Sequence, residues 1–129
     1  MSRLLLDTHV LLWWFTDDKQ LSATSKSAIA DGANEVYASA ASAWEIATKM
    51  RLGKLNDLPD AALRYGEMVA TNGFTHLPIS YRHALAAGGF QTDHRDPFDR
   101  MLAAQSKLEG IPLVTKDPAF SNFEADILW

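Results

Sequence analysis

Short apolar runs alternate with amphipathic segments along this chain, and that alternation is its strongest structural signal. Between the runs, apolar residues recur every three or four positions, as they do on one face of a helix. Short strands that alternate with helices predict an α/β fold with a mostly parallel sheet. The candidate strands are the short apolar runs at residues 4–6, 36–38, 75–79, 111–114 and 126–129.

Helix signals between these runs predict six helices, at residues 10–15, 22–30, 42–52, 59–72, 80–87 and 97–109. Ser42 and Glu45 have the spacing of a capping box, which predicts a helix start at Ser42. Asp96 predicts an N-cap, because proline follows it at the first helical position.

The helix at residues 10–15 is apolar on nearly every side, which is typical of a helix that is buried or meets a partner. Trp13, Trp14 and Phe15 are three large rings within one turn and cannot all point inward. We therefore expect at least one of them to contact a partner.

Length and composition fit one globular domain over residues 1–129, with 47% apolar and 22% charged residues. The chain has no cysteine, which excludes a disulfide framework, a thiolate zinc site and a cysteine nucleophile. Its apolar runs are too short for a membrane span or a signal-peptide core. These features predict a cytoplasmic protein without a membrane partner.

The charge balance is acidic, since 12 Lys and Arg face 16 Asp and Glu and the net charge is −4. Spread over the surface, such an excess argues against a nucleic-acid partner, because nucleic acids usually bind to basic surfaces.

Several carboxylates stand where a parallel α/β sheet binds its ligands, beyond the carboxyl ends of the strands. Asp7 and Asp117 follow predicted strands, and Glu45, Asp96 and Asp99 lie in the first turns of predicted helices. Asp99 also lies at the edge of the apolar face of its helix, where burying an unpaired carboxylate costs free energy. Carboxylates that share a site repel one another unless a cation holds them. Oxygen ligands favour Mg²⁺ or Mn²⁺, and the four histidines lack the HExxH spacing of a zinc site.

Most of these acids also have a purely structural interpretation. Asp7, Asp96 and Asp117 are placed to accept hydrogen bonds from the backbone of the turn or helix that follows. Glu45 is placed to complete the capping box or to pair with Lys49 one turn later. The functional interpretation therefore depends on the acids meeting at one site.

Four motifs, in this order and in a chain of this length, resemble the PIN-domain ribonucleases, and among them the VapC toxins of bacterial toxin–antitoxin pairs. The resemblance covers essentially the whole chain. The motifs are Leu5-Leu6-Asp7-Thr8-His9, Ser42-Ala43-Trp44-Glu45-Ile46, the segment from His94 to Gln105, and Leu113-Val114-Thr115-Lys116-Asp117.

This resemblance implies a three-layer α/β/α domain and assigns roles to individual residues. The implied catalytic acids are Asp7, Glu45, Asp99 and Asp117, of which Asp7 and Asp99 are the expected direct ligands of Mg²⁺ or Mn²⁺. The implied supporting residues are Asp96, as an N-cap and outer-shell group, and Thr115, as a hydrogen-bond partner of a ligand water. The expected contacts to RNA phosphates are Arg95, Arg100 and Lys116.

The resemblance further implies metal-dependent hydrolysis of RNA that leaves 5′-phosphate and 3′-hydroxyl ends. The implied partners are an RNA substrate, a VapB-like antitoxin and a second copy of the chain, in a homodimer or a larger toxin–antitoxin assembly.

Two other acidic α/β classes fit the sequence less well. A haloacid-dehalogenase-type phosphatase needs a second aspartate two residues after the first, and here the segment is Asp7-Thr8-His9. A receiver-like phosphoacceptor module, the main alternative, needs an acidic pair after the first strand and a separate acceptor aspartate, yet Asp7 stands alone. A pure interaction module would have no need of the intact set of acids.

The acidic balance has a different meaning if the acids share one site. The excess of 16 acids over 12 bases is four, and the implied catalytic acids number four. The net charge then describes one negative pocket, partly neutralised by a divalent cation, on an otherwise neutral chain.

Overall fold

Five parallel strands form one sheet in the order β3-β2-β1-β4-β5, with β1 at its centre. The structure is a computed structural model that describes residues 1–129. It confirms the predicted α/β class with a parallel sheet. The strands are β1 (Arg3–Leu6), β2 (Glu35–Ser39), β3 (Thr75–Leu77), β4 (Leu113–Val114) and β5 (Ile127–Leu128).

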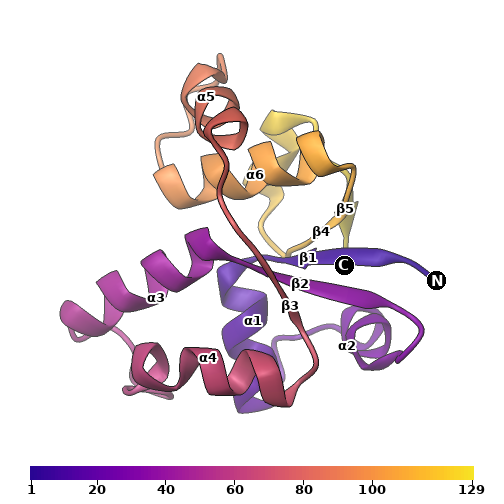
Figure 1. The fold of residues 1–129 in the computed structure, drawn as a ribbon, viewed down its shortest axis with the longest axis vertical. Coiled ribbons are helices and arrows are strands. Elements are labelled where there is room, and N and C mark those ends of the chain that lie inside the picture. Colours follow the sequence, from indigo (N-terminus) through magenta and orange to yellow (C-terminus); the bar gives the residue numbers. More distant parts are fainter.

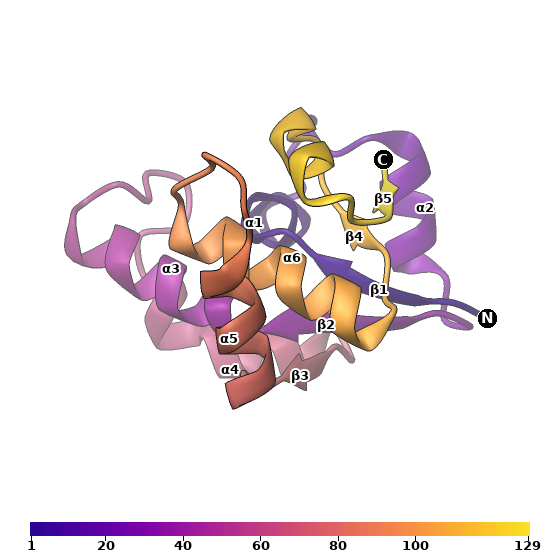
Figure 2. The ribbon, with the colours of Figure 1, turned by 90° about the horizontal axis from the view of Figure 1, so that it is seen from above.

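Helices cover both faces of the sheet and give the three layers that the resemblance implied (Figure 1). The first four helices lie on one face, and the last two, with a 3₁₀ helix, lie on the other. Figure 2 shows the 3₁₀ helix beside the last long helix. The helices are α1 (Thr8–Thr16), α2 (Ala23–Ala30), α3 (Ala40–Arg51), α4 (Ala61–Thr71), α5 (Tyr81–Gly89), α6 (Pro97–Glu109) and the 3₁₀ helix η1 (Pro118–Phe123).

The central strand divides the core into two clusters. Leu4 and Leu6 pack with α1 to α4, whereas Leu5 points the other way and packs with α6 and η1. All three leucines are at most 1% exposed. This alternation is the two-residue period of a strand that is buried on both faces, which explains why β1 is a continuous apolar run.

The predicted helix start at Ser42 is wrong. Helix α3 begins at Ala40, because Ser39 at the end of β2 is its N-cap and accepts a hydrogen bond from the Ala41 amide (2.9 Å). The Ser42 hydroxyl instead shares a buried hydrogen bond with the Thr8 hydroxyl (2.9 Å). Glu45 therefore takes no part in a capping box.

The topology places the carboxyl ends of β1 and β4 at a switch point, since the chain leaves β1 toward β2 and later returns on the opposite side as β4. Such a point is where open α/β sheets bind their ligands. The Asp7 amide donates to the Val114 carbonyl (3.0 Å), which fixes the residues after the two strands beside each other. None of the helices is long and apolar enough to cross a membrane.

Candidate active site

Asp7 is buried at the end of β1, with only 5% of its surface exposed. It is the N-cap residue of α1, but its side chain makes no capping hydrogen bond. Its Oδ2 atom accepts a hydrogen bond from the Thr115 hydroxyl instead (2.8 Å). Burial raises the pKa of Asp7, the negative charge of Glu45 adds to this, and the Thr115 hydrogen bond opposes it. The side chain is thus turned into the site rather than used as a cap.

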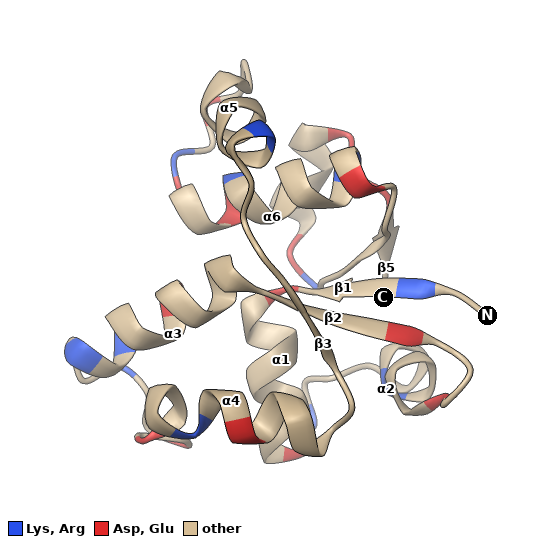
Figure 3. Ribbon diagram, in the orientation of Figure 1, with Lys and Arg blue, Asp and Glu red and all other residues tan.

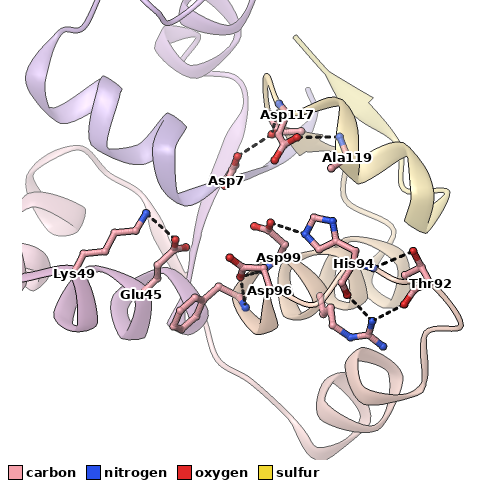
Figure 4. Close-up of polar contacts among 12 residues, drawn as sticks. Asp7, Glu45, Lys49, Thr92, His94, Asp96, Asp99, Asp117 and Ala119 are labelled. Atoms are coloured by element: carbon pink, nitrogen blue, oxygen red, sulfur yellow. Dashed lines mark hydrogen bonds and ion pairs between the residues drawn. The ribbon is translucent and has the colours of Figure 1, made fainter. Parts of the chain in front are cut away.

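Glu45 is also buried, on α3, and its carboxylate is paired with the Lys49 ammonium (2.9 Å) one turn later. The ion pair that the sequence suggested as a structural alternative is therefore present. Glu45 nevertheless lies close enough to Asp7 for its charge to raise the pKa of that residue. Lys49 holds the Glu45 carboxylate in place without removing it from the site (Figure 4).

Asp99 lies in the first turn of α6 and is positioned by two neighbours. Asp96 caps the helix, accepting hydrogen bonds from the amides of Phe98 (2.9 Å) and Asp99 (3.1 Å). Its expected capping role is confirmed. The ring Nε2 of His94 lies 2.8 Å from Asp99 Oδ2. Asp99 and His94 are both largely shielded, with side chains 18% and 15% exposed.

The pKa of Asp99 is raised to about 7. Burial is the main cause, and the negative charges of Asp96 and Asp7 raise the pKa further, while the His94 hydrogen bond lowers it. The charge of Asp7 therefore contributes to the pKa of Asp99, and the charge of Glu45 contributes to the pKa of Asp7. These couplings show that Asp7, Glu45 and Asp99, which come from three separate elements, meet at one site (Figure 4).

The site also contains a residue whose role sequence reasoning missed, since His94 is the first residue of the third motif but is assigned no function there. A signal existed, because His94 precedes a proline-started helix by three residues and the intervening turn folds its ring back over Asp99.

Thr115 and Asp117 follow β4 and complete the arrangement. The Thr115 hydroxyl bonds to Asp7 and also accepts from the Asp117 amide (3.1 Å). The Asp117 carboxylate accepts from the Ala119 amide (2.9 Å) and so caps η1, as its structural interpretation suggested. Asp117 still faces a cavity of about 330 Å³ that Asp7 also lines. A direct catalytic role for Asp117 stays a prediction.

The three expected RNA contacts differ in their surroundings. The Lys116 ammonium lies 6.0 Å from the centre of the Trp13 ring and lines the same cavity as Asp7. Arg95 is exposed beside the Asp96 cap. Arg100 donates all five of its N–H groups to backbone carbonyls and has none left for a phosphate, so it holds the loop before α6 instead. Its acceptors are the carbonyls of Ala87, Gly88, Phe90, Thr92 and His94.

The donor set at this site suits a hard divalent cation. The negative charge of Asp7 raises the pKa of Asp99, so a cation between the two carboxylates would relieve their repulsion. No three His, Asp or Glu side chains lie close enough together to hold a metal ion between them. Mg²⁺ typically takes one or two carboxylates and fills its shell with water and phosphate oxygens, so a pair of aspartates fits it.

Comparison with known proteins gives consistent results. Residues 4–125 match the PIN domain family. The chain is 31% identical over 120 residues to ribonuclease VapC22 of Mycobacterium tuberculosis. The aligned region covers 91% of this chain and 88% of that protein.

Two solved structures share the fold. VapBC2 from Rickettsia felis, bound to a promoter DNA fragment, matches with a TM-score of 0.72 and 13% identity over 98% of each chain. VapBC-1 from nontypeable Haemophilus influenzae matches with a TM-score of 0.68 and 15% identity, over 98% of this chain and 97% of that chain.

Proposed function

The chain belongs to the PIN domain family and, within it, to the VapC group, and from this we propose that it is a metal-dependent endoribonuclease, the toxin of a toxin–antitoxin pair. One observation carries the proposal: Asp7, at the switch point of the sheet, lies near enough to Glu45 for that acid to raise its pKa, and near enough to Asp99 to raise the pKa of Asp99 in turn. A structural protein has no need to concentrate repelling carboxylates in this way, whereas phosphodiester hydrolysis uses them to hold a cation.

Asp7 and Asp99 would hold Mg²⁺ or Mn²⁺. When bound, such an ion lowers the pKa of a water and stabilises the charge that develops at phosphorus. The chain's own residues prepare that site. Thr115 orients Asp7 (2.8 Å) and His94 orients Asp99 (2.8 Å), so each carboxylate keeps one oxygen for the ligand side.

The reaction is hydrolysis of an RNA phosphodiester by an in-line water. Glu45 or Asp99 takes a proton from the water as its oxygen bonds to phosphorus. The bond from phosphorus to O3′ breaks, O3′ takes a proton from a solvent water and leaves as a 3′-hydroxyl, and the other fragment retains a 5′-phosphate. Lys116, which lines the cavity beside Asp7, is placed to contact a phosphate of the substrate.

The proposed partner is a VapB-like antitoxin, because several proteins with this fold were solved as VapBC complexes, some with DNA. Homodimers of this chain within a larger toxin–antitoxin assembly are proposed on the same ground.

The direct test incubates purified protein with total RNA and Mg²⁺ or Mn²⁺. We expect cleavage, its loss in EDTA, and 5′-phosphate ends on the products by mass spectrometry. Asp7→Asn should abolish cleavage, whereas Glu67→Gln, which neutralises an exposed acid on α4, should leave it intact. Fragments that form equally well in EDTA would overturn the proposal, as would stoichiometric phosphorylation by acetyl phosphate, which a receiver-like module would show.

In cells, expression of the chain alone should arrest growth, and co-expression of its antitoxin should restore growth. Normal growth in the presence of abundant folded protein would argue against the role as a toxin.

A further inference from the structure

His9 and Trp13, on consecutive turns of α1, form a wall between two cavities. The first cavity, of about 330 Å³, contains Asp7 and Lys116. The second, of about 200 Å³, lies on the other side of the wall, between α1 and residues 54–58 after α3. It reaches Lys49, whose ammonium is paired with Glu45 (2.9 Å), whereas the first cavity is lined by Asp7 itself.

The wall itself is aromatic and accessible. The His9 and Trp13 rings lie 5.9 Å apart at a tilt of 39°, and Trp129 contacts Trp13 edge-on at 6.1 Å. His9 is exposed and Trp13 is half-buried, so each ring has a surface that the core does not cover. Leu55 and Leu58 line the second cavity opposite the wall. Such a slot between rings and aliphatic side chains matches the flat apolar face of a nucleobase.

Cations lie on both sides of this wall. Lys116 is placed over Trp13, on the side of the first cavity. Lys49 and Lys54 line the second cavity, and Figure 3 shows that basic residues gather at this end of α3 and in the segment after it. A strand of RNA that crosses the wall would have lysines for its phosphates before and after the acids, despite the acidic balance of the chain as a whole.

The rim of the second cavity carries groups that can distinguish bases. Asn56 and Asp57 are exposed on it, and Asp18, whose carboxylate also accepts from the Gln20 amide (2.9 Å), lies at its edge. Carboxylates only accept hydrogen bonds, so they pair with bases that have an exocyclic amino group. Uracil, which presents two carbonyl oxygens and a single N–H on its pairing edge, fits such a rim less well.

We propose that the cavity lined by Trp13, Lys54 and Asp57 is a nucleobase subsite, which takes one unpaired, amino-bearing base of the RNA next to the phosphate that is cut. This proposal rests on the proposed nuclease function and adds to it the cavity that holds the base and the bases that this cavity accepts. A base held in a duplex is stacked and paired, so it cannot enter a slot of this size without being extruded. The aromatic wall and Lys54, which line the same cavity, suit a base and its phosphate.

Binding of labelled oligonucleotides to the metal-free full-length protein in EDTA tests the subsite without cleavage. Fluorescence anisotropy would compare eight-nucleotide RNAs that differ at one base with a duplex of the same sequence. We expect tighter binding of the single strands, and of adenine, cytosine or guanine over uracil at the variable base. Trp13→Ala should weaken binding about tenfold or more, because it removes a stacking surface, whereas Trp13→Phe should retain most of it.

Two further variants keep the test decisive if Trp13→Ala fails to fold. Lys54→Ala should weaken the binding of all single strands, and Asp57→Asn should reduce the discrimination against uracil. Tyr81→Ala and Arg82→Ala, which change an exposed aromatic residue and an exposed cation on α5, are the matched controls and should leave binding unchanged.

The subsite is overturned if the Lys54 and Asp57 variants bind every oligonucleotide as wild type does. It is also overturned if no oligonucleotide binds and the antitoxin instead buries Trp13. That result would make the cavity a protein-docking site. Because this assay uses neither metal nor cleavage, base-selective binding by a protein that cuts no RNA would refute the nuclease proposal alone. Cleavage that the Lys54 and Asp57 substitutions leave unchanged in rate and position would refute the subsite alone.

Discussion

Replacing Asp99 by asparagine should stabilise the metal-free protein while it abolishes function. The pKa of Asp99 is about 7 in the folded chain and 3.8 as its ordinary value. At a pH between these two pKa values, the Asp99 carboxyl keeps its proton in the folded protein but has released it in the unfolded chain. The stability linked to that proton is present below about pH 4 and is lost as the pH rises through 7.

The size of this effect follows from the pKa. A difference of about 3 units corresponds to about 4 kcal/mol for a carboxylate in a dry site. The Asp99 side chain is 18% exposed, and solvent screening reduces the cost, so we expect ~2 kcal/mol. Asparagine keeps an oxygen that can accept from His94 but carries no charge, so the Asp99→Asn variant should be more stable than wild type by about this amount at pH 8.

Urea unfolding in EDTA at pH 5 and pH 8 measures the effect. The difference between the two proteins isolates Asp99, because every other ionisable side chain is present in both. We expect the free energy of unfolding of wild type to fall more steeply between the two pH values than that of Asp99→Asn. Adding Mg²⁺ at pH 8 should stabilise wild type and leave the variant nearly unchanged. If Asp99→Asn is less stable than wild type at pH 8, or both proteins have the same pH dependence, the electrostatic account of the site is wrong.

Three further predictions address the groups around the acids. Thr115→Val keeps the shape of the side chain but removes the hydrogen bond to Asp7 (2.8 Å). It should lower the free energy of unfolding in urea by about 1–3 kcal/mol and slow RNA cleavage at least tenfold. Thr115→Ser is the control, and a Val variant with unchanged stability and cleavage would contradict this role of Thr115. Arg100→Met removes the donors of five backbone carbonyls and should speed amide hydrogen exchange in residues 88–95, at a cost of ~3 kcal/mol; unchanged exchange would show that the loop does not depend on Arg100. Mg²⁺ affinity measured by calorimetry should rise about tenfold from pH 6 to pH 8, because an Asp99 with a pKa of about 7 must release its proton to bind a cation, and a flat profile would exclude Asp99 as a ligand.

The sequence was sufficient to predict the sheet, because a buried parallel strand reads as an apolar run, and residues after such strands share one edge of the sheet. Asp7 and Asp117, which follow β1 and β4, could therefore be expected near each other before any contact was known. Glu45 lies within a helix, and only the resemblance to the PIN-domain ribonucleases assigned it to the same site. The ends of α6 were equally clear, since Asp96 with its following proline and Gly110 in the left-handed conformation are local signals.

Other features depend on contacts between distant parts of the chain and could not be predicted. Ser39 and Ser42 are both good N-cap residues, and only the buried bond between Ser42 and Thr8 decides that α3 begins after Ser39. Arg100 was expected to contact RNA because it lies next to the acids in the sequence. Its five acceptors lie at the end of α5 and in the loop before α6, and nothing in the local sequence indicates that they converge on one guanidinium.

Single-turnover cleavage of one defined RNA in Mg²⁺, by wild type and by a folded Asp99→Asn variant, tests whether the carboxylates at the end of β1 carry out metal-dependent cleavage of RNA. We expect wild type to cut the RNA and Asp99→Asn to leave it intact, although the variant is the more stable protein at pH 8. If the variant cuts as fast as wild type, these carboxylates do not form the catalytic metal site.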